Sequence, residues 1–125
     1  MSNPYVIIIE DDPSLGEIYQ AALKQIGFEV GLDKMGDQFK DMLESNTPLL
    51  IILDLHMPYA RGEDILMEIR SNERWKDIPV VIITADLINA KKFEGKEAQV
   101  LIKPVSAFRL REIAANMVLK FNHQA

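Results

Sequence analysis

The 125-residue sequence contains no cysteine and only two histidines, His56 and His123. The absence of cysteine excludes a disulfide scaffold, a thiolate zinc site and a cysteine nucleophile. Two histidines also argue against a histidine-rich metal site. No apolar run approaches the roughly 20 residues that span a bilayer, and no basic N-terminal segment leads into an apolar core. We therefore predict a cytoplasmic location and no membrane partner.

Charge and length narrow the functional classes further. With 14 Lys and Arg against 19 Asp and Glu, the net charge is −5, which disfavours direct binding to nucleic-acid phosphates. Hydrophobic residues make up 48% of the chain and charged residues 26%, as in globular proteins rather than disordered ones. The length is typical of one domain. We predict a single domain that covers residues 1–125.

Short apolar runs rich in β-branched residues recur along the chain. They are Tyr5–Ile9, Leu49–Leu53, Val80–Ile83 and Val100–Ile102, and the weaker run Phe28–Leu32 is expected to form an edge strand. Unbroken apolar runs of this length are typical of strands that are covered on both faces, as in a parallel sheet.

Helical patterns lie between these runs. The expected helices are marked by Leu15–Ile26, Phe39–Leu43, Ile65–Asn72 and Phe108–Phe121, and the weakest pattern is at Leu87–Glu97. Gly27 is placed to end the first helix, and Ser106 is a candidate N-cap for the last. Alternating strands and helices predict a doubly wound α/β fold, with right-handed crossovers and helices on both faces of a parallel sheet.

Ligands of such sheets bind beyond the carboxyl ends of the strands. The residues that close the four strong runs are Glu10 and Asp11, Asp54, Thr84, and Lys103. They are therefore expected to gather at one edge of the sheet.

These residue types suit phosphoryl chemistry. Clustered carboxylates repel one another and need a cation, and an all-oxygen site suits Mg²⁺. Lys103 and Thr84 can contact a phosphoryl oxygen, and a carboxylate can be the nucleophile toward phosphorus. Asp54, alone at its strand end, is the natural acceptor, with Glu10 and Asp11 holding the metal.

A simpler interpretation exists for each position taken alone. One strand-terminal Asp is usually a turn or cap residue, residues 10–14 can merely start a helix, and Lys103-Pro104 can be an ordinary strand exit. Four independent strand ends with complementary chemistry favour a phosphorylation site over that interpretation.

The motifs occur in an order and spacing that resemble the receiver domain of two-component response regulators. They are Ile8–Pro13, Leu53–Pro58 followed by Gly62, Ile83–Ala85 and Ile102–Pro104. The resemblance covers essentially the whole chain. It implies a flavodoxin-like (βα)5 sandwich of three layers, with strand order 2-1-3-4-5.

The resemblance also implies a function. A sensor histidine kinase or a histidine phosphotransfer protein would transfer a phosphoryl group to Asp54, in a switch rather than a turnover enzyme. Mg²⁺ would be held by Glu10, Asp11, Asp54 and the backbone carbonyl of His56. Thr84 and Lys103 would contact the phosphoryl group and signal to the region of the fourth helix and fifth strand. A downstream protein or a C-terminal output domain would receive the signal.

Three features depart from the family pattern. Val100 occupies the position of a common aromatic switch residue, and Val105 follows Pro104 where an aromatic is common. Only 18 residues separate Thr84 from Lys103, which predicts a truncated fourth helix. Signalling is therefore expected to use the loop from Ala85 to Ala90 and the short helix after it instead of an aromatic swing.

Two further positions are expected to tune the lifetime of the phosphorylated state. In the family, the residues two after the acceptor and two after the threonine flank the attacking water, and here these are His56 and Asp86. The alternative is that both are solvated loop side chains. Leu87 and Ile88, nearby, are expected either to anchor in the core or to form a partner-binding patch.

Two other functional classes share parts of this description. A flavodoxin-like cofactor binder has the same architecture, but the loop after the first run is acidic and has no phosphate-binding glycines. A haloacid dehalogenase-type phosphohydrolase also forms an aspartyl phosphate, but it typically has a second Asp two residues after the nucleophile. His56 stands there in this sequence.

Overall fold

Five strands and five helices alternate along the chain in the computed structural model, which describes residues 3–93 and 98–124. The strands are β1 (Tyr5–Ile9), β2 (Glu29–Asp33), β3 (Leu50–Asp54), β4 (Val80–Thr84) and β5 (Gln99–Ile102). The helices are α1 (Pro13–Gln25), α2 (Phe39–Ser45), α3 (Gly62–Ser71), α4 (Leu87–Phe93) and α5 (Ala107–Gln124). No helix among the described residues is both long enough and apolar enough to cross a membrane.

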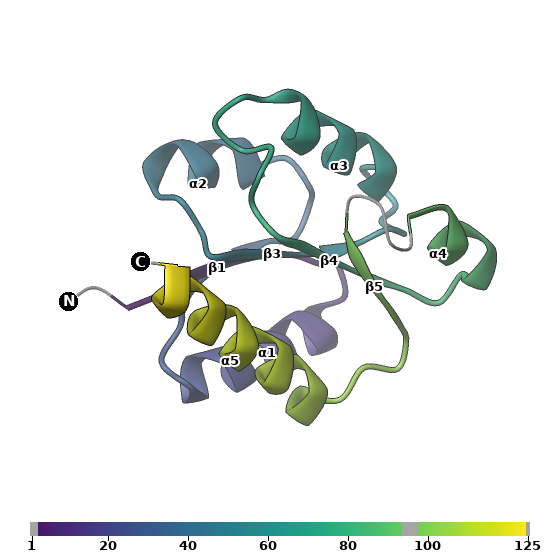
Figure 1. The fold of residues 1–125 in the computed structure, drawn as a ribbon. Coiled ribbons are helices and arrows are strands. Elements are labelled where there is room, and N and C mark those ends of the chain that lie inside the picture. The colour runs from purple at the N-terminus through teal and green to yellow at the C-terminus, as the bar shows by residue number, and fades with distance from the viewer. Residues whose placement is uncertain (1–2, 94–97, 125) are drawn as a thin grey trace.

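All neighbouring strands are parallel, in the order β2-β1-β3-β4-β5, which confirms the expected architecture. Helices α1 and α5 cover one face of the sheet, and α2 and α3 cover the other (Figure 1). The register pairs Ile9 with Leu53, Asp54 with Ile83, and Thr84 with Ile102. The carboxyl ends of β1, β3, β4 and β5 therefore meet at one edge of the sheet.

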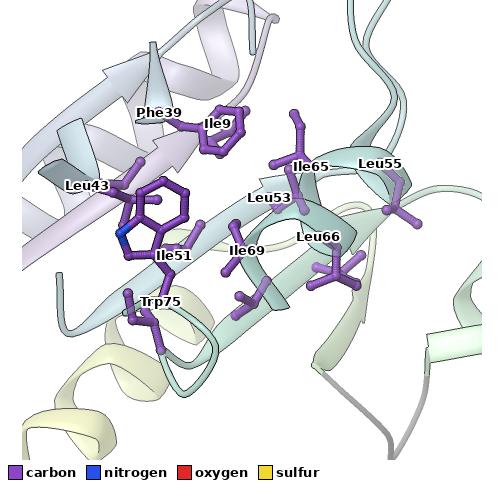
Figure 2. Close-up of a cluster of buried hydrophobic side chains, with 14 of the residues drawn as sticks. Ile9, Phe39, Leu43, Ile51, Leu53, Leu55, Ile65, Leu66, Ile69 and Trp75 are labelled. Carbon is purple, nitrogen blue, oxygen red and sulfur yellow. The ribbon is translucent and has the colours of Figure 1, made fainter. Parts of the chain in front are cut away.

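Strand alternation divides the core into two layers. On β1, Ile7 and Ile9 face α2 and α3, and Figure 2 shows Ile9 in this layer with Trp75 and residues of α3. Val6 and Ile8 face α1 and α5, a side of the sheet that we call the α1/α5 face. Each such side chain stabilises the fold by about 1.5–3 kcal/mol when it is fully buried.

The strand ends differ slightly from the prediction. The edge strand begins at Glu29 instead of Phe28, whose N–H donates to the Leu23 carbonyl at the end of α1. It continues to Asp33, one residue beyond the expected end. Asp54 and Thr84 are likewise the last residues of their strands, so backbone pairing holds both of them.

The apolar pattern that predicts the last helix consists of Phe108, Ile113, Met117, Val118 and Phe121, and its assignment to the buried face was partly wrong. Phe108 and Phe121 are exposed, and the buried residues of α5 are Leu110, Ile113 and Ala114. Ile18 and Ile26 of the first predicted stripe are also exposed. The predicted N-cap is confirmed, because Ser106 Oγ accepts a hydrogen bond of 3.0 Å from the N–H of Arg109.

Helix α4 is short, as expected from the spacing, with seven residues. It begins at Leu87, so most of the segment predicted as a loop from Ala85 to Ala90 is helical. Leu87 and Ile88 are exposed and Ala90 is the buried residue, which rules out core anchoring by the first two. The end of the predicted segment, at residues 94–97, lies outside the described residues.

Candidate functional site

Three carboxylates meet at the carboxyl edge of the sheet. Glu10, Asp11 and Asp54 each offer one oxygen atom, and these oxygens lie within 4.8 Å of one another. We call these three residues the acidic cluster. Strand alternation places Glu10 two residues after Ile8 and Asp54 two after Ile52, so both are on the α1/α5 face. Both are almost fully buried.

Lys103 provides the positive charge of the site. Its Nζ lies 3.4 Å from Glu10 Oε1 and 3.4 Å from Asp54 Oδ2. The N–H of Lys103 donates to the Thr84 carbonyl at 2.8 Å, which fixes the residue at the end of β5. Burial alone would lower the pKa of Lys103, but the charges of Asp54 and Glu10 raise it above its ordinary value. The ammonium group is therefore held in its charged form.

The pKa of Glu10 reflects its burial and the repulsion between the carboxylates of the acidic cluster. Burial, a hydrogen bond with Asp54 and repulsion from the Asp54 charge raise the pKa of Glu10 to about 8. Lys103 opposes this rise only in part. Because one cation does not compensate the carboxylates, a second positive charge would favour their ionised forms.

The arrangement fits a divalent metal ion. Among the described residues, Glu10 Oε1 is buried without a hydrogen-bond partner. Buried polar atoms usually have partners, and this one belongs to a cluster made only of carboxylate oxygens. Such oxygens are the ligands that Mg²⁺ and other hard cations prefer.

The loop after β3 depends on glycine at position 62. A Cβ atom there would lie 2.6 Å from Leu55 Cα and 2.7 Å from the Asp54 carbonyl oxygen. The N–H of Gly62 donates to the Leu55 carbonyl at 3.3 Å, and the N–H of His56 donates to Asp54 Oδ1 at 3.1 Å. The start of α3 therefore packs directly on the loop that carries Asp54, and this contact restricts the position of the carboxylate.

The structure brings His56 and Asp86 together from two different loops. His56 Nε2 lies 3.5 Å from Asp86 Oδ2. Asp86 Oδ1 also accepts hydrogen bonds from the N–H groups of Ile88 and Asn89 at 3.0 and 3.2 Å, so it caps α4. These hydrogen bonds, and secondarily the charge of His56, lower the pKa of Asp86. The two side chains are thus paired with each other, although His56 is exposed, and their effect on the lifetime of the phosphorylated state stays a prediction.

Thr84 lies beside the acidic cluster but is directed elsewhere. It is fully buried, and its Oγ1 accepts a hydrogen bond of 3.0 Å from the N–H of Asp86. Among the described contacts, none joins this hydroxyl to Asp54. Ala85 is exposed, and Val100 is half-buried against the α2/α3 layer, away from the acidic cluster.

Asp33 is a structural residue of this edge that the sequence analysis missed. Its fully buried carboxylate accepts hydrogen bonds from five successive backbone N–H groups, those of residues 35–39, at 2.8–3.3 Å. The sequence signal was an Asp followed by Gly36, a residue pair typical of a turn. In contrast, the helix-start interpretation of residues 10–14 holds for Asp12, whose Oδ1 accepts from Ser14 and Leu15.

Known proteins resemble this chain over nearly its whole length. The family model of the response regulator receiver domain matches residues 6–115. The transcriptional regulatory protein QseB of Escherichia coli O157:H7 is 36% identical over 115 residues, which are 90% of this chain and 50% of QseB. BaeR of Escherichia coli O6:H1 is 32% identical over 93% of this chain and 47% of its own. The chain thus spans about half the length of these curated relatives.

Solved structures agree with the sequence comparisons. The signal receiver domain of a LuxO repressor protein from Vibrio parahaemolyticus is 30% identical, with a TM-score of 0.82. The match covers 98% of this chain and 95% of that one. The chemotaxis response regulator CheY4 of Vibrio cholerae, 22% identical with a TM-score of 0.80, shares the fold. The chain belongs to the response regulator receiver domain family of two-component systems.

Proposed function

We propose that residues 1–125 act as one receiver domain in which Asp54 accepts a phosphoryl group. The observation that carries this assignment is the nearly buried Asp54 carboxylate at the end of β3, 3.4 Å from the Lys103 ammonium group and within the acidic cluster. The phosphodonor is a sensor histidine kinase or a histidine phosphotransfer protein. The domain acts in the cytoplasm with that donor and signals to a downstream protein or an attached output domain.

In the transfer step, an Asp54 oxygen attacks phosphorus and forms a P–O bond. The P–N bond of the phosphohistidine breaks, and its electron pair returns to the imidazole nitrogen of the donor. Lys103 stabilises the charge on the transferring oxygens, and the Thr84 hydroxyl turns from the Asp86 N–H to donate to one of them. The product is an aspartyl phosphate, and the chain changes conformation instead of turning over a substrate.

The residues that would hold Mg²⁺ are Glu10, Asp11, Asp54 and the backbone carbonyl of His56. The ion would supply positive charge to the phosphoryl oxygens and would relieve repulsion in the acidic cluster. Glu10 Oε1, which has no hydrogen-bond partner among the described residues, and the raised pKa of Glu10 support this role. Val100 and the short α4 support signalling without an aromatic switch.

The test is phosphorylation by acetyl phosphate with Mg²⁺, measured by intact mass. We expect one added phosphoryl group in the parent protein and none in Asp54→Asn, while Asp64→Asn on the exposed part of α3 stays labelled. A chelator should stop the reaction, as should replacement of both Glu10 and Asp11 by Ala. Labelling of Asp54→Asn at the parent level would refute the assignment. Bound flavin, or turnover of phosphate esters, would instead favour one of the two other functional classes.

A further inference from the structure

Tyr19 is a buried residue of α1 that the proposed chemistry does not use. Its side chain is 1% exposed and packs among the apolar residues of the α1/α5 face, in the same cluster as Ile8 and Ile52. Its hydroxyl has no hydrogen-bond partner among the described residues. Only one other buried side-chain polar atom in that part of the chain shares this condition, and it is Glu10 Oε1.

A tyrosine hydroxyl without a hydrogen-bond partner is unfavourable in an apolar core. Removal of a hydroxyl from water without a compensating hydrogen bond destabilises the fold, and Phe would fill nearly the same space without that penalty. A buried tyrosine therefore usually has a partner for its O–H group. We therefore expect the hydroxyl of Tyr19 to have a polar partner on its side of the sheet.

The acidic cluster lies on that side. Glu10 and Asp54 follow Ile8 and Ile52 by two residues, and alternation along a strand places all four side chains on the α1/α5 face. The electrostatics agree with this placement. Burial raises the pKa of the Tyr19 hydroxyl, the charges of Glu10 and Asp54 raise it further, and Lys103 lowers it. The Tyr19 hydroxyl is thus close enough to the acidic cluster and Lys103 to be affected by their charges.

We propose that Tyr19 is a positioning residue for Glu10, whose carboxylate it holds through one buried water molecule. The Tyr19 O–H donates to the water, and the water donates to Glu10 Oε1. Buried waters typically make about three hydrogen bonds, and Lys103 Nζ, 3.4 Å from Glu10 Oε1, is a third polar group within reach. One water satisfies both unpartnered atoms.

This bridge would fix both oxygens of the carboxylate. Glu10 Oε2 already accepts a hydrogen bond of 3.4 Å from the N–H of Asp12. With Oε1 held from the other side, Glu10 is oriented before a cation binds, and no rotamer freedom is lost on binding. Groups that hold metal ligands in this way typically change metal affinity by about 10–100-fold. The inference rests on the proposed function, because that proposal assigns Glu10 to the metal.

The experiment measures Mg²⁺ affinity by titration calorimetry on the unphosphorylated protein. Tyr19→Phe removes only the hydroxyl, and we expect the dissociation constant to rise about tenfold. Tyr5→Phe is the matched control. Tyr5 is the first residue of β1, at the end of the strand opposite to Glu10, so this change should leave the Mg²⁺ affinity unchanged. In a Glu10→Gln background, Tyr19→Phe should have little further effect, because the hydroxyl acts through Glu10.

The outcomes separate this inference from the proposed function. An unchanged affinity in Tyr19→Phe, or an equal loss in the Glu10→Gln background, overturns the role of Tyr19 even if Asp54 is phosphorylated normally. The expected loss of affinity supports it, even if Asp54 were not the acceptor. A crystal structure that has no water between the Tyr19 hydroxyl and Glu10 would also overturn it.

Discussion

Lys103 Nζ lies 3.4 Å from Asp54 Oδ2, across the edge of the sheet formed by β3, β4 and β5. The lysine is therefore in place before any phosphoryl group arrives. It neutralises the carboxylate in the resting state, and the same charge is available to the transferring oxygens.

Replacement of Lys103 by Met should slow phosphorylation by acetyl phosphate at least about tenfold. A hydrogen bond to a charged group contributes about 1.5–3 kcal/mol, and about 1.4 kcal/mol corresponds to a factor of ten in rate. Rates are measured by intact mass at saturating Mg²⁺. Lys40→Met, which removes an exposed ion pair with Glu68, is the control and should react at the parent rate. A Lys103→Met rate within about twofold of the parent would refute this role.

The metal-free protein should lose stability as the pH rises, because of Glu10. The pKa of Glu10 is about 8 in the folded protein, against 4.5 for the ordinary group. Between these values the folded state binds more protons than the unfolded state, so the free energy of unfolding falls with increasing pH. The stability from the protonated carboxyl is complete below pH 4.5 and is lost as the pH passes about 8.

Urea unfolding in the presence of a chelator, at several pH values, measures this effect. Glu10 alone contributes a slope of up to about 1.4 kcal/mol per pH unit, and Glu10→Gln should remove that part. Glu17→Gln, at an exposed position of α1, should keep the parent slope. Identical slopes in the parent and in Glu10→Gln would show that burial does not raise the pKa of Glu10.

The His56 and Asp86 pair should set the lifetime of the phosphorylated state. Replacement of either residue should change the dephosphorylation rate severalfold and leave phosphorylation nearly constant, because the pair joins the loop that follows Asp54 to the loop after β4. Asp86→Asn is cleaner than Asp86→Ala, since an amide oxygen can still cap α4. If the two residues act as a unit, the double variant His56→Ala, Asp86→Asn should have the same dephosphorylation rate as the single variants. Unchanged decay in all variants would refute the idea.

Phosphorylation should alter the segment from Thr84 to Phe93 more than the region of Val100. Thr84 Oγ1 accepts from the Asp86 N–H, so a phosphoryl group that draws the hydroxyl away breaks a contact at the start of α4. Val100 is β-branched and half-buried, and it has no ring to exchange between two positions. Amide exchange with and without beryllofluoride is the measurement. Changes confined to Val100 and α5 would contradict this route.

Asp33→Ala should destabilise the fold by about 3 kcal/mol or more. The substitution leaves the backbone N–H groups of five residues without their acceptor, in a segment where Phe39 is buried. Urea unfolding measures the loss. Asp37→Ala, at an exposed position of the same loop, should change stability by less than about 0.5 kcal/mol. Similar stabilities for the two variants would show that the five hydrogen bonds contribute little.

Most of the strands and the residue types at their ends were predictable, because both depend on neighbouring residues. The apolar run before Asp54 predicts a buried strand, and alternation along parallel strands brings its end beside Lys103 whatever residues form the helices. The short α4 followed from the spacing between Thr84 and Lys103. The strand order needed the family resemblance, because apolar runs alone do not distinguish one neighbour from another.

Most of the remaining features are long-range contacts, and only the tertiary structure decided them. The sequence by itself determined the strands, most of the helices and the residue types at the carboxyl edge, since short-range periodicity encodes them. It did not determine that Asp33 would hold a loop, that His56 would meet Asp86, or that Tyr19 would be buried without a partner. The last two depend on the positions of segments that are distant in sequence, which packing of the complete sheet against its helices sets. The hydrogen bonds of Asp33 reach only residues 35–39, and they depend on a loop conformation that one Asp and one Gly do not specify.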